Sequence, residues 1–237
     1  MALIMVTGAA TGLGLDTAAA LAEEGHDVVV HVRNRSRLAD AGGTERWKGV
    51  VTGDLAVLDE MRDAARQAAA FGRFDAVVHN AGTMRQGEAG EVNTVAPYVL
   101  TALMDKPARL IYLSSGMHRG GSTDLRRLSA GTASYSDSKL WVTAFALAIA
   151  SRWPGTSAHA VDPGWVPTRM GGPGAPDDLT AGSRTQMWLA TSGDVTPPTG
   201  GYWYHQRVQQ PHPAARDASF QAQLLESLER HTGIPLG

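Results

Sequence analysis

The stretch Thr7-Gly8-Ala9-Ala10-Thr11-Gly12-Leu13-Gly14 decides the fold of this chain. It follows the apolar run Ala2–Val6 and opens a helical pattern. Gly8 permits a tight turn, Gly12 lets the backbone come close to a pyrophosphate, and Gly14 allows the helix to pack against the strand. The helix N-terminus then offers free N–H groups and the positive end of its dipole to the phosphates. We therefore predict a dinucleotide-binding turn that includes Thr11 and Leu13.

Apolar runs and helical patterns alternate along the rest of the chain. The predicted strands are Ala2–Val6, Asp27–Val32, Gly49–Thr52, Asp75–His79, Arg109–Leu113, Ser157–Val161 and Gly201–Tyr204. The predicted helices are Gly14–Glu24, Ala56–Phe71, Val92–Met104, Ser134–Trp153, Ala181–Ser192 and Phe220–His231. Most of the strands are near-continuous Val, Ile, Leu and Ala, which is typical of strands covered on both faces. We predict one α/β domain over residues 1–237, a doubly wound Rossmann sheet of seven parallel strands with helices on both faces.

Composition and charge exclude several classes of protein. The 237 residues include 21 Lys and Arg against 23 Asp and Glu, a net charge of −2, which excludes a broad basic surface for nucleic acid or an anionic membrane. The absence of cysteine excludes thiolate metal sites and cysteine nucleophiles and fits a reducing compartment, so we expect a cytoplasmic protein. The histidines show no ligand spacing, so we expect no metal. The longest apolar stretch, Trp141–Ala150, is shorter than the roughly 18 residues of a membrane span.

A second pattern, Tyr135-x-x-x-Lys139, lies inside a predicted helix. Residues four apart share one helical face. The pKa of a free tyrosine is about 10, and a nearby ammonium group lowers it by favouring the phenolate. That effect would make Tyr135 a usable acid–base group near neutral pH. The same spacing also arises by chance on helix surfaces, so the pattern alone leaves both readings open.

Together, the glycine turn and the Tyr135–Lys139 pair resemble the short-chain dehydrogenase/reductase family, in its compact one-domain branch. Further matching segments extend the resemblance over essentially the whole chain. They are His79-Asn80-Ala81-Gly82, Val92-Asn93-Thr94, Ser114-Ser115 and the stretch from Asp162 to Thr168. The run Ser115–His118 and the segment Gly201–Trp203 are similar to retinol-dehydrogenase-like and carbonyl-reductase-like members, which carry insertions before the tyrosine.

The resemblance implies hydride transfer between a nicotinamide and a carbonyl or alcohol carbon. Tyr135 would exchange a proton with the substrate oxygen, and Lys139 would bind the nicotinamide ribose. Ser115 would position the substrate oxygen, and Asn93 would hold a water that relays protons, although it could merely bond the backbone. Ser122 lies at the family's usual spacing before Tyr135, but Ser115 ends a strand as the family serine does, so we favour Ser115.

The end of the second strand bears on the choice of nicotinamide cofactor. Folds of this type that select NAD place an acid there, whereas this chain has Arg33-Asn34. A guanidinium suits a 2′-phosphate by charge and by bidentate geometry, so we predict NADP(H) over NAD(H). A solvated basic loop is the alternative. The resemblance adds further cofactor contacts, namely Asp54, Leu55, Asn80, Ala81, Gly82, Pro163, Gly164, Val166 and Thr168. Asp54 is also a candidate N-cap for the helix that follows it.

Two alternatives to an NADP(H)-dependent carbonyl reductase remain on the sequence alone. One is an NADP(H)-binding sensor without turnover, although such proteins commonly lose the tyrosine or the lysine. The other is an epimerase or dehydratase on the same fold. Specificity for a small-molecule substrate would lie in a lid at about residues 171–192.

The predicted helix Ser134–Trp153 is apolar around almost its whole circumference. Such a helix is normally buried on all sides, and no other segment is an obvious cover for its outer face. The insertion Met117–Ala133 is short and mostly polar. Exposed apolar faces often mark interfaces, so we predict a homodimer or homotetramer that pairs through this helix.

Overall fold

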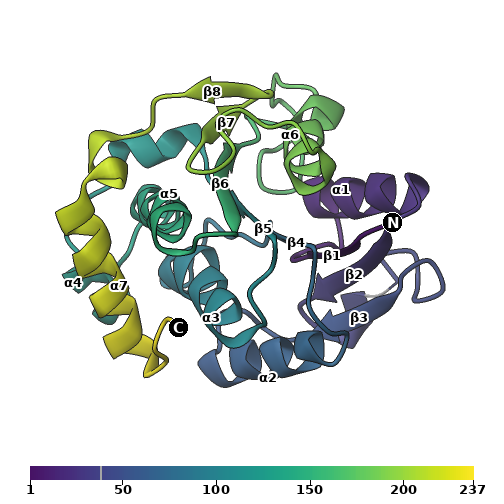
Figure 1. Cartoon of the computed structure of the whole chain (residues 1–237), viewed down its shortest axis with the longest axis horizontal. Coiled ribbons are helices and arrows are strands. Elements are labelled where there is room, and N and C mark those ends of the chain that lie inside the picture. The colour runs from purple at the N-terminus through teal and green to yellow at the C-terminus, as the bar shows by residue number, and fades with distance from the viewer. Residues whose placement is uncertain (38) are drawn as a thin grey trace.

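In the computed structural model, which describes residues 1–37 and 39–237, eight strands form one sheet in the order β3-β2-β1-β4-β5-β6-β7-β8 (Figure 1). The strands are β1 (Leu3–Val6), β2 (Asp27–Val32), β3 (Gly49–Thr52), β4 (Ala76–His79), β5 (Arg109–Leu113), β6 (Ser157–Asp162), β7 (Tyr202–Tyr204) and β8 (Arg207–Gln209). Strands β1 to β7 are parallel, and β8 pairs antiparallel with β7. The prediction of seven strands therefore missed β8, because this short edge strand is exposed and has only one apolar residue.

Helices cover both faces of the sheet. They are α1 (Gly12–Glu23), α2 (Leu58–Ala69), α3 (Ala96–Leu103), α4 (Arg126–Ser129), α5 (Tyr135–Arg152), α6 (Leu179–Thr191) and α7 (Ala218–Thr232). Helices α1 and α6 lie on one face, and α2, α3 and α5 lie on the other (Figure 1). Among residues 1–37 and 39–237 there are also four short helical segments, namely η1 (Arg35–Arg37), η2 (Glu91–Val95), η3 (Gly116–Gly120) and η4 (Pro213–Arg216). Within the described ranges, none of the helices has the length and apolarity to span a bilayer.

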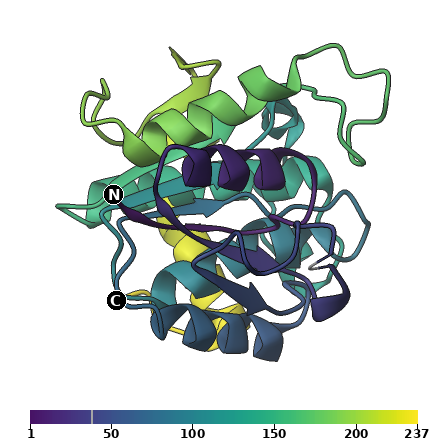
Figure 2. The same cartoon turned by 90° about the vertical axis from the view of Figure 1, so that its right-hand side faces the viewer.

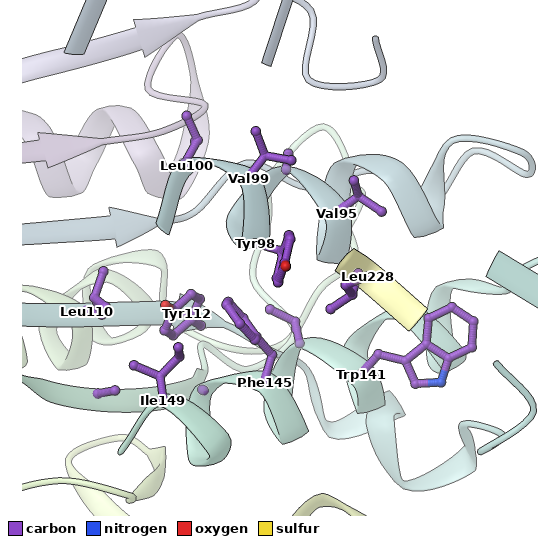
Figure 3. Packing of buried hydrophobic residues seen from close by; sticks show 14 of the residues in the cluster. Val95, Tyr98, Val99, Leu100, Leu110, Tyr112, Trp141, Phe145, Ile149 and Leu228 are labelled. Carbon is purple, nitrogen blue, oxygen red and sulfur yellow. The ribbon is translucent and has the colours of Figure 1, made fainter. Parts of the chain in front are cut away.

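The larger apolar core lies between the sheet and helices α2, α3, α5 and α7. Its centre is aromatic: Tyr112 and Phe145 pack edge to face with ring centroids 5.4 Å apart, and Tyr98 lies 5.6 Å from Phe145 (Figure 3). The Tyr98 hydroxyl donates to the carbonyl oxygen of Ile234 at 2.6 Å. The C-terminal segment is thereby tied into the core beside α3.

Helix α5 is covered within the chain, contrary to the expectation from sequence. It contacts η3, η4 and α7, and α7 lies beside it in Figure 1. Leu224 and Leu228 of α7 are fully buried in the same cluster as Trp141 and Phe145. The insertion also contributes, because the Trp141 indole donates to the Ser122 carbonyl oxygen at 2.8 Å. The premise that nothing in the chain covers this helix is therefore wrong, and the oligomer stays a prediction without that support.

Candidate active site

The loops that follow the carboxyl ends of the parallel strands surround one cleft of about 400 Å³. Fifteen residues singled out from the sequence line it: Gly8, Thr11, Gly12, Leu13, Gly14, Arg33, Asp54, Leu55, Asn80, Ala81, Gly82, Tyr135, Lys139, Pro163 and Thr168. Five others do not line this cleft: Asn34, Asn93, Ser115, Gly164 and Val166. Sequence reasoning missed several lining residues, among them His31, Arg85, Glu88, Arg169 and Met170.

The glycine turn has the geometry that its sequence predicts. Gly8 and Gly12 have φ angles of 66° and 60°, a region that side chains with a Cβ rarely adopt. A Cβ on Gly8 would lie 2.8 Å from the Cα of Ala81, and one on Gly14 would lie 2.6 Å from the Gly8 carbonyl oxygen. The Asn80 amide donates to the Thr7 carbonyl oxygen at 2.9 Å and fixes the turn to the end of β4. The turn thus leaves an open cradle at the N-terminus of α1, which fits a pyrophosphate.

His31 supports this turn from β2. Its Nδ1 accepts from the Gly8 N–H at 3.3 Å, and its Nε2 donates to the Gly53 carbonyl oxygen at 3.0 Å. Burial lowers the pKa of His31 to about 4, so the ring is neutral and can accept from Gly8. In the sequence, the one feature that could have pointed to a role for His31 is its position as a polar residue inside the apolar strand Asp27–Val32.

Arg33 and Asp54 lie together at the wall of the cleft, where the sequence predicts the adenosine part of the cofactor. The Arg33 Nε and Nη2 groups donate to Asp54 Oδ2 at 2.8 and 2.6 Å. The hydrogen bond to Asp54 raises the pKa of Arg33, and its side chain is about half exposed. Asp54 does not cap α2, because Val57 is the N-cap residue; instead, its Oδ1 accepts from the Ala56 N–H at 3.0 Å. Arg85 pairs with Glu88 on the same rim.

Tyr135 and Lys139 come together on the first turns of α5. A capping box between Ser134 and Asp137 starts the helix immediately before Tyr135. The Lys139 Nζ donates to the Leu113 carbonyl oxygen at 2.6 Å and lies 5.6 Å from the centroid of the Tyr135 ring. Lys139 is almost completely buried, and burial lowers its pKa to about 8.

The pKa of Tyr135 differs from the sequence expectation. Burial raises it, the hydrogen bond with the Ser115 side chain lowers it, and the Asp162 carboxylate raises it further. The direction is therefore upward, because desolvation of the phenolate outweighs the groups that stabilise it. The structure thus keeps Tyr135 in its proton-donating form.

The two candidate serines differ in position. Ser115 precedes η3, accepts from the Met117 N–H at 3.2 Å, and lies near enough to Tyr135 to lower the pKa of its hydroxyl. Ser122 instead lies against the start of α5, where its N–H donates to Asp137 Oδ1 at 2.7 Å. Of the two serines, Ser115 is therefore the one beside Tyr135, and its contact with a substrate oxygen stays a prediction.

Asn93 lies in η2, a π-helical turn that leads into α3. Its Oδ1 accepts from the Thr83 N–H at 2.8 Å, and its Nδ2 donates to the Thr83 carbonyl oxygen and to the Ser138 hydroxyl, both at 2.9 Å. The side chain therefore fixes the loop after β4 to helix α5. Its role in a water relay stays a prediction.

The segment after β6 contributes Pro163, Thr168, Arg169 and Met170 to the lining of the cleft. The loop that precedes α6 projects from the body of the molecule in Figure 2, and it carries the exposed side chains Trp165 and Met170. Helix α6, over Leu179–Thr191, packs on α1 and on the sheet. Of the predicted lid at 171–192, only the part before α6 is therefore a loop beside the site.

Comparisons with known proteins agree with this geometry. A family model described as short chain dehydrogenase matches residues 2–112. The chain is 34% identical to short-chain dehydrogenase chyC of Penicillium rubens, over 100% of this chain and 99% of the relative. It is 28% identical to human retinol dehydrogenase 13, over 98% of this chain and 84% of the relative. A blue fluorescent protein from a metagenomic library, solved in complex with NADPH, has the same fold, with a TM-score of 0.70, 20% identity, and coverage of 86% of this chain and 95% of that one.

Proposed function

This chain belongs to the short-chain dehydrogenase family, and from that premise we propose that it is an NADP(H)-dependent reductase of ketones or aldehydes. The observation that carries the proposal is one cleft that joins the glycine cradle to the Tyr135–Lys139 pair. A nucleotide-binding protein without turnover needs the cradle, but it does not need a buried lysine beside a tyrosine.

The residues that would hold the cofactor fit a dinucleotide with a 2′-phosphate. The glycine turn and the N-terminus of α1 would take the pyrophosphate. Arg33 would take the 2′-phosphate, because its pair with Asp54 uses only part of its five N–H donors. Lys139 would contact the nicotinamide ribose. When bound, the cofactor supplies the hydride.

The chain's own groups handle the substrate oxygen. Ser115 and Tyr135, whose hydroxyl groups influence each other, would each donate to that oxygen and hold the carbonyl in place. Tyr135 is protonated at neutral pH and transfers its proton to the oxygen as negative charge develops there. The buried Lys139 ammonium then stabilises the phenolate that Tyr135 becomes, at a ring distance of 5.6 Å. Burial raises the pKa of Tyr135 above its ordinary value, so its hydroxyl carries a proton at neutral pH.

Two measurements test the proposal. Calorimetry compares the binding of NADPH and NADH, and the loss of NADPH absorbance reports turnover of a panel of aromatic and aliphatic ketones and aldehydes. We expect tighter binding of NADPH and turnover of at least one carbonyl compound. NADPH binding without turnover of any panel member would favour a sensor. Preference for NADH would contradict the role of Arg33.

A further inference from the structure

Asp162, at the end of β6, lies on the substrate side of the candidate active site. Its Oδ2 is 3.1 Å from the position that a Cβ on Gly116 would occupy, and Gly116 directly follows Ser115. The Asp162 carboxylate also contributes to the pKa shifts of Tyr135 and Lys139. The carboxylate therefore faces the place where the reacting carbonyl would be held.

Two hydrogen bonds fix the carboxylate in position. Asp162 Oδ1 accepts from the Gly164 N–H at 3.0 Å, and Oδ2 accepts from the Tyr202 hydroxyl at 3.2 Å. Tyr202 is buried and packs on His118, with ring centroids 4.7 Å apart. A group held this rigidly contributes to recognition without further ordering.

His118 extends this support to the serine segment. It is fully buried, its Nδ1 donates to the Ser115 carbonyl oxygen at 2.8 Å, and its Nε2 accepts from the His212 N–H at 2.9 Å. The hydrogen bonds and ring contact thus connect Ser115, His118, Tyr202 and Asp162. The serine and the carboxylate are consequently parts of one preorganised unit.

No cation pairs with this carboxylate among residues 1–37 and 39–237. The two nearby cations are otherwise engaged: Lys139 donates to the Leu113 carbonyl oxygen, and Arg119 donates to the Gln210 carbonyl oxygen. A second carboxylate, Asp177, accepts from the Trp165 N–H at 2.6 Å in the adjoining loop. This side of the site is therefore acidic, and the indole of Trp165 is exposed beside it.

We propose that Asp162 is a specificity-determining residue that selects carbonyl substrates bearing a positively charged amine a few bonds from the carbonyl group. This inference rests on the proposed function. A carboxylate fixed by two neutral donors keeps its charge free for a substrate ammonium. The exposed aromatic face of Trp165 adds a second attraction for a cation. The hydride transfer itself is the same for charged and neutral substrates.

Two ketones of matched shape test the assignment: β-(dimethylamino)propiophenone, which carries an ammonium group at neutral pH, and isohexanophenone, which replaces the nitrogen by carbon. The readout is the ratio of their kcat/KM values with NADPH, because that ratio cancels losses common to both. We expect wild type to favour the amino ketone by about 10-fold or more, the value of one charge-assisted contact. Asp162→Asn should bring the ratio close to one, whereas Asp177→Asn, which removes a neighbouring charge, should leave most of it.

A wild-type ratio near one would overturn the proposal whether or not the variant folds. A ratio unchanged in Asp162→Asn, or lost equally in Asp177→Asn, would overturn the assignment to Asp162. Turnover of neither ketone, with turnover of other carbonyl compounds, would also contradict this substrate class. If NADPH binds but no carbonyl compound of any kind is reduced, the proposed function itself fails, which is a distinguishable result.

Discussion

The two halves of the sheet depend on different kinds of information. The half from β1 to β4 is organised by backbone geometry at one turn, where Gly8, Gly12 and Gly14 leave room that a Cβ would fill. The half from β5 to α7 is organised by side chains distant in sequence, such as Leu228 of α7 packed in one cluster with Trp141 of α5. A short motif therefore predicts the cofactor half, whereas the substrate half depends on contacts that no local pattern shows.

The same contrast separates the two parts of the candidate site. The cradle for the cofactor consists largely of backbone groups and glycines. The substrate part would consist of individual side chains from three separate places in the chain, namely Ser115 in the loop after β5, Tyr135 on α5 and Asp162 on β6. Substitutions should therefore act on chemistry and stability in the second half and on cofactor affinity in the first.

The largest expected effect is on chemistry. Tyr135→Phe removes the proton donor and keeps the ring, so turnover should fall by about 10² to 10⁴-fold with little change in NADPH affinity. Steady-state kinetics and calorimetry on the same samples measure the two quantities. A variant that keeps more than about a tenth of wild-type turnover, with chemistry rate-limiting, would remove Tyr135 from the mechanism.

The next effect tests the intramolecular cover of α5. Leu228 is fully buried, so Leu228→Ala should lower the free energy of unfolding by about 2–5 kcal/mol. The exposed residue Gln223 on the same helix is the control, and Gln223→Ala should change the free energy of unfolding by less than about 0.5 kcal/mol. Denaturant unfolding gives both values. Equal, small effects would mean that α7 does not cover α5 in solution.

Sedimentation tests the same region without a substitution. Because α7, η3 and η4 cover α5, pairing through this helix is not expected, and an oligomer found by sedimentation at micromolar concentration would have to use another surface. A dimer that dissociates on Leu228→Ala would restore the interface predicted from sequence.

A third effect depends on pH. The pKa of Lys139 is about 8 in the fold against 10.5 ordinarily, so the unfolded chain binds this proton more tightly. Wild type should therefore lose stability as pH falls from about 10.5 to about 8. Lys139→Met lacks this loss, so its free energy of unfolding relative to wild type should be about 3 kcal/mol higher at pH 7 than at high pH. A difference that does not change with pH would contradict the buried ammonium.

The smallest expected effect lies in the cofactor half. Arg33→Ala should weaken NADPH binding by about 10- to 150-fold and NADH binding far less, because only NADPH carries the 2′-phosphate. Arg35→Ala is the matched control, since Arg35 is an exposed arginine two positions away. Calorimetry measures the affinity of both variants for NADPH and for NADH. If Arg33→Ala lowers the affinity for NADPH and for NADH equally, Arg33 does not bind the 2′-phosphate and is only part of a solvated loop.

Sequence predicted most of the fold because most of the strands from β1 to β7 are largely apolar and the glycine turn has few possible conformations. It missed β8, whose exposed residues pair only through the backbone with β7. It also misjudged the cover of α5, because an amphipathic pattern in α7 does not show which helix it packs against.

Within the candidate site, the outcome follows the same division. The residues predicted from the glycine turn and from the Tyr135–Lys139 spacing line the same cleft in the structure. The sequence predicted a lowered pKa for Tyr135, but the pKa is raised. Burial causes this shift, and burial depends on the whole fold and not on a local pattern. His31 and Asp162 were not assigned roles, since their functions depend on partners far away in sequence, such as Gly53 and Tyr202.

A crystal structure of the chain with NADP⁺ tests the central claim most directly, that one cleft binds this cofactor between the glycine turn and the Tyr135–Lys139 pair. We predict the pyrophosphate at the N-terminus of α1, the 2′-phosphate in contact with the Arg33 guanidinium, and the nicotinamide ribose within hydrogen-bond distance of Lys139 Nζ. A cofactor bound outside this cleft, or one whose nicotinamide ribose does not meet Lys139, would contradict the account.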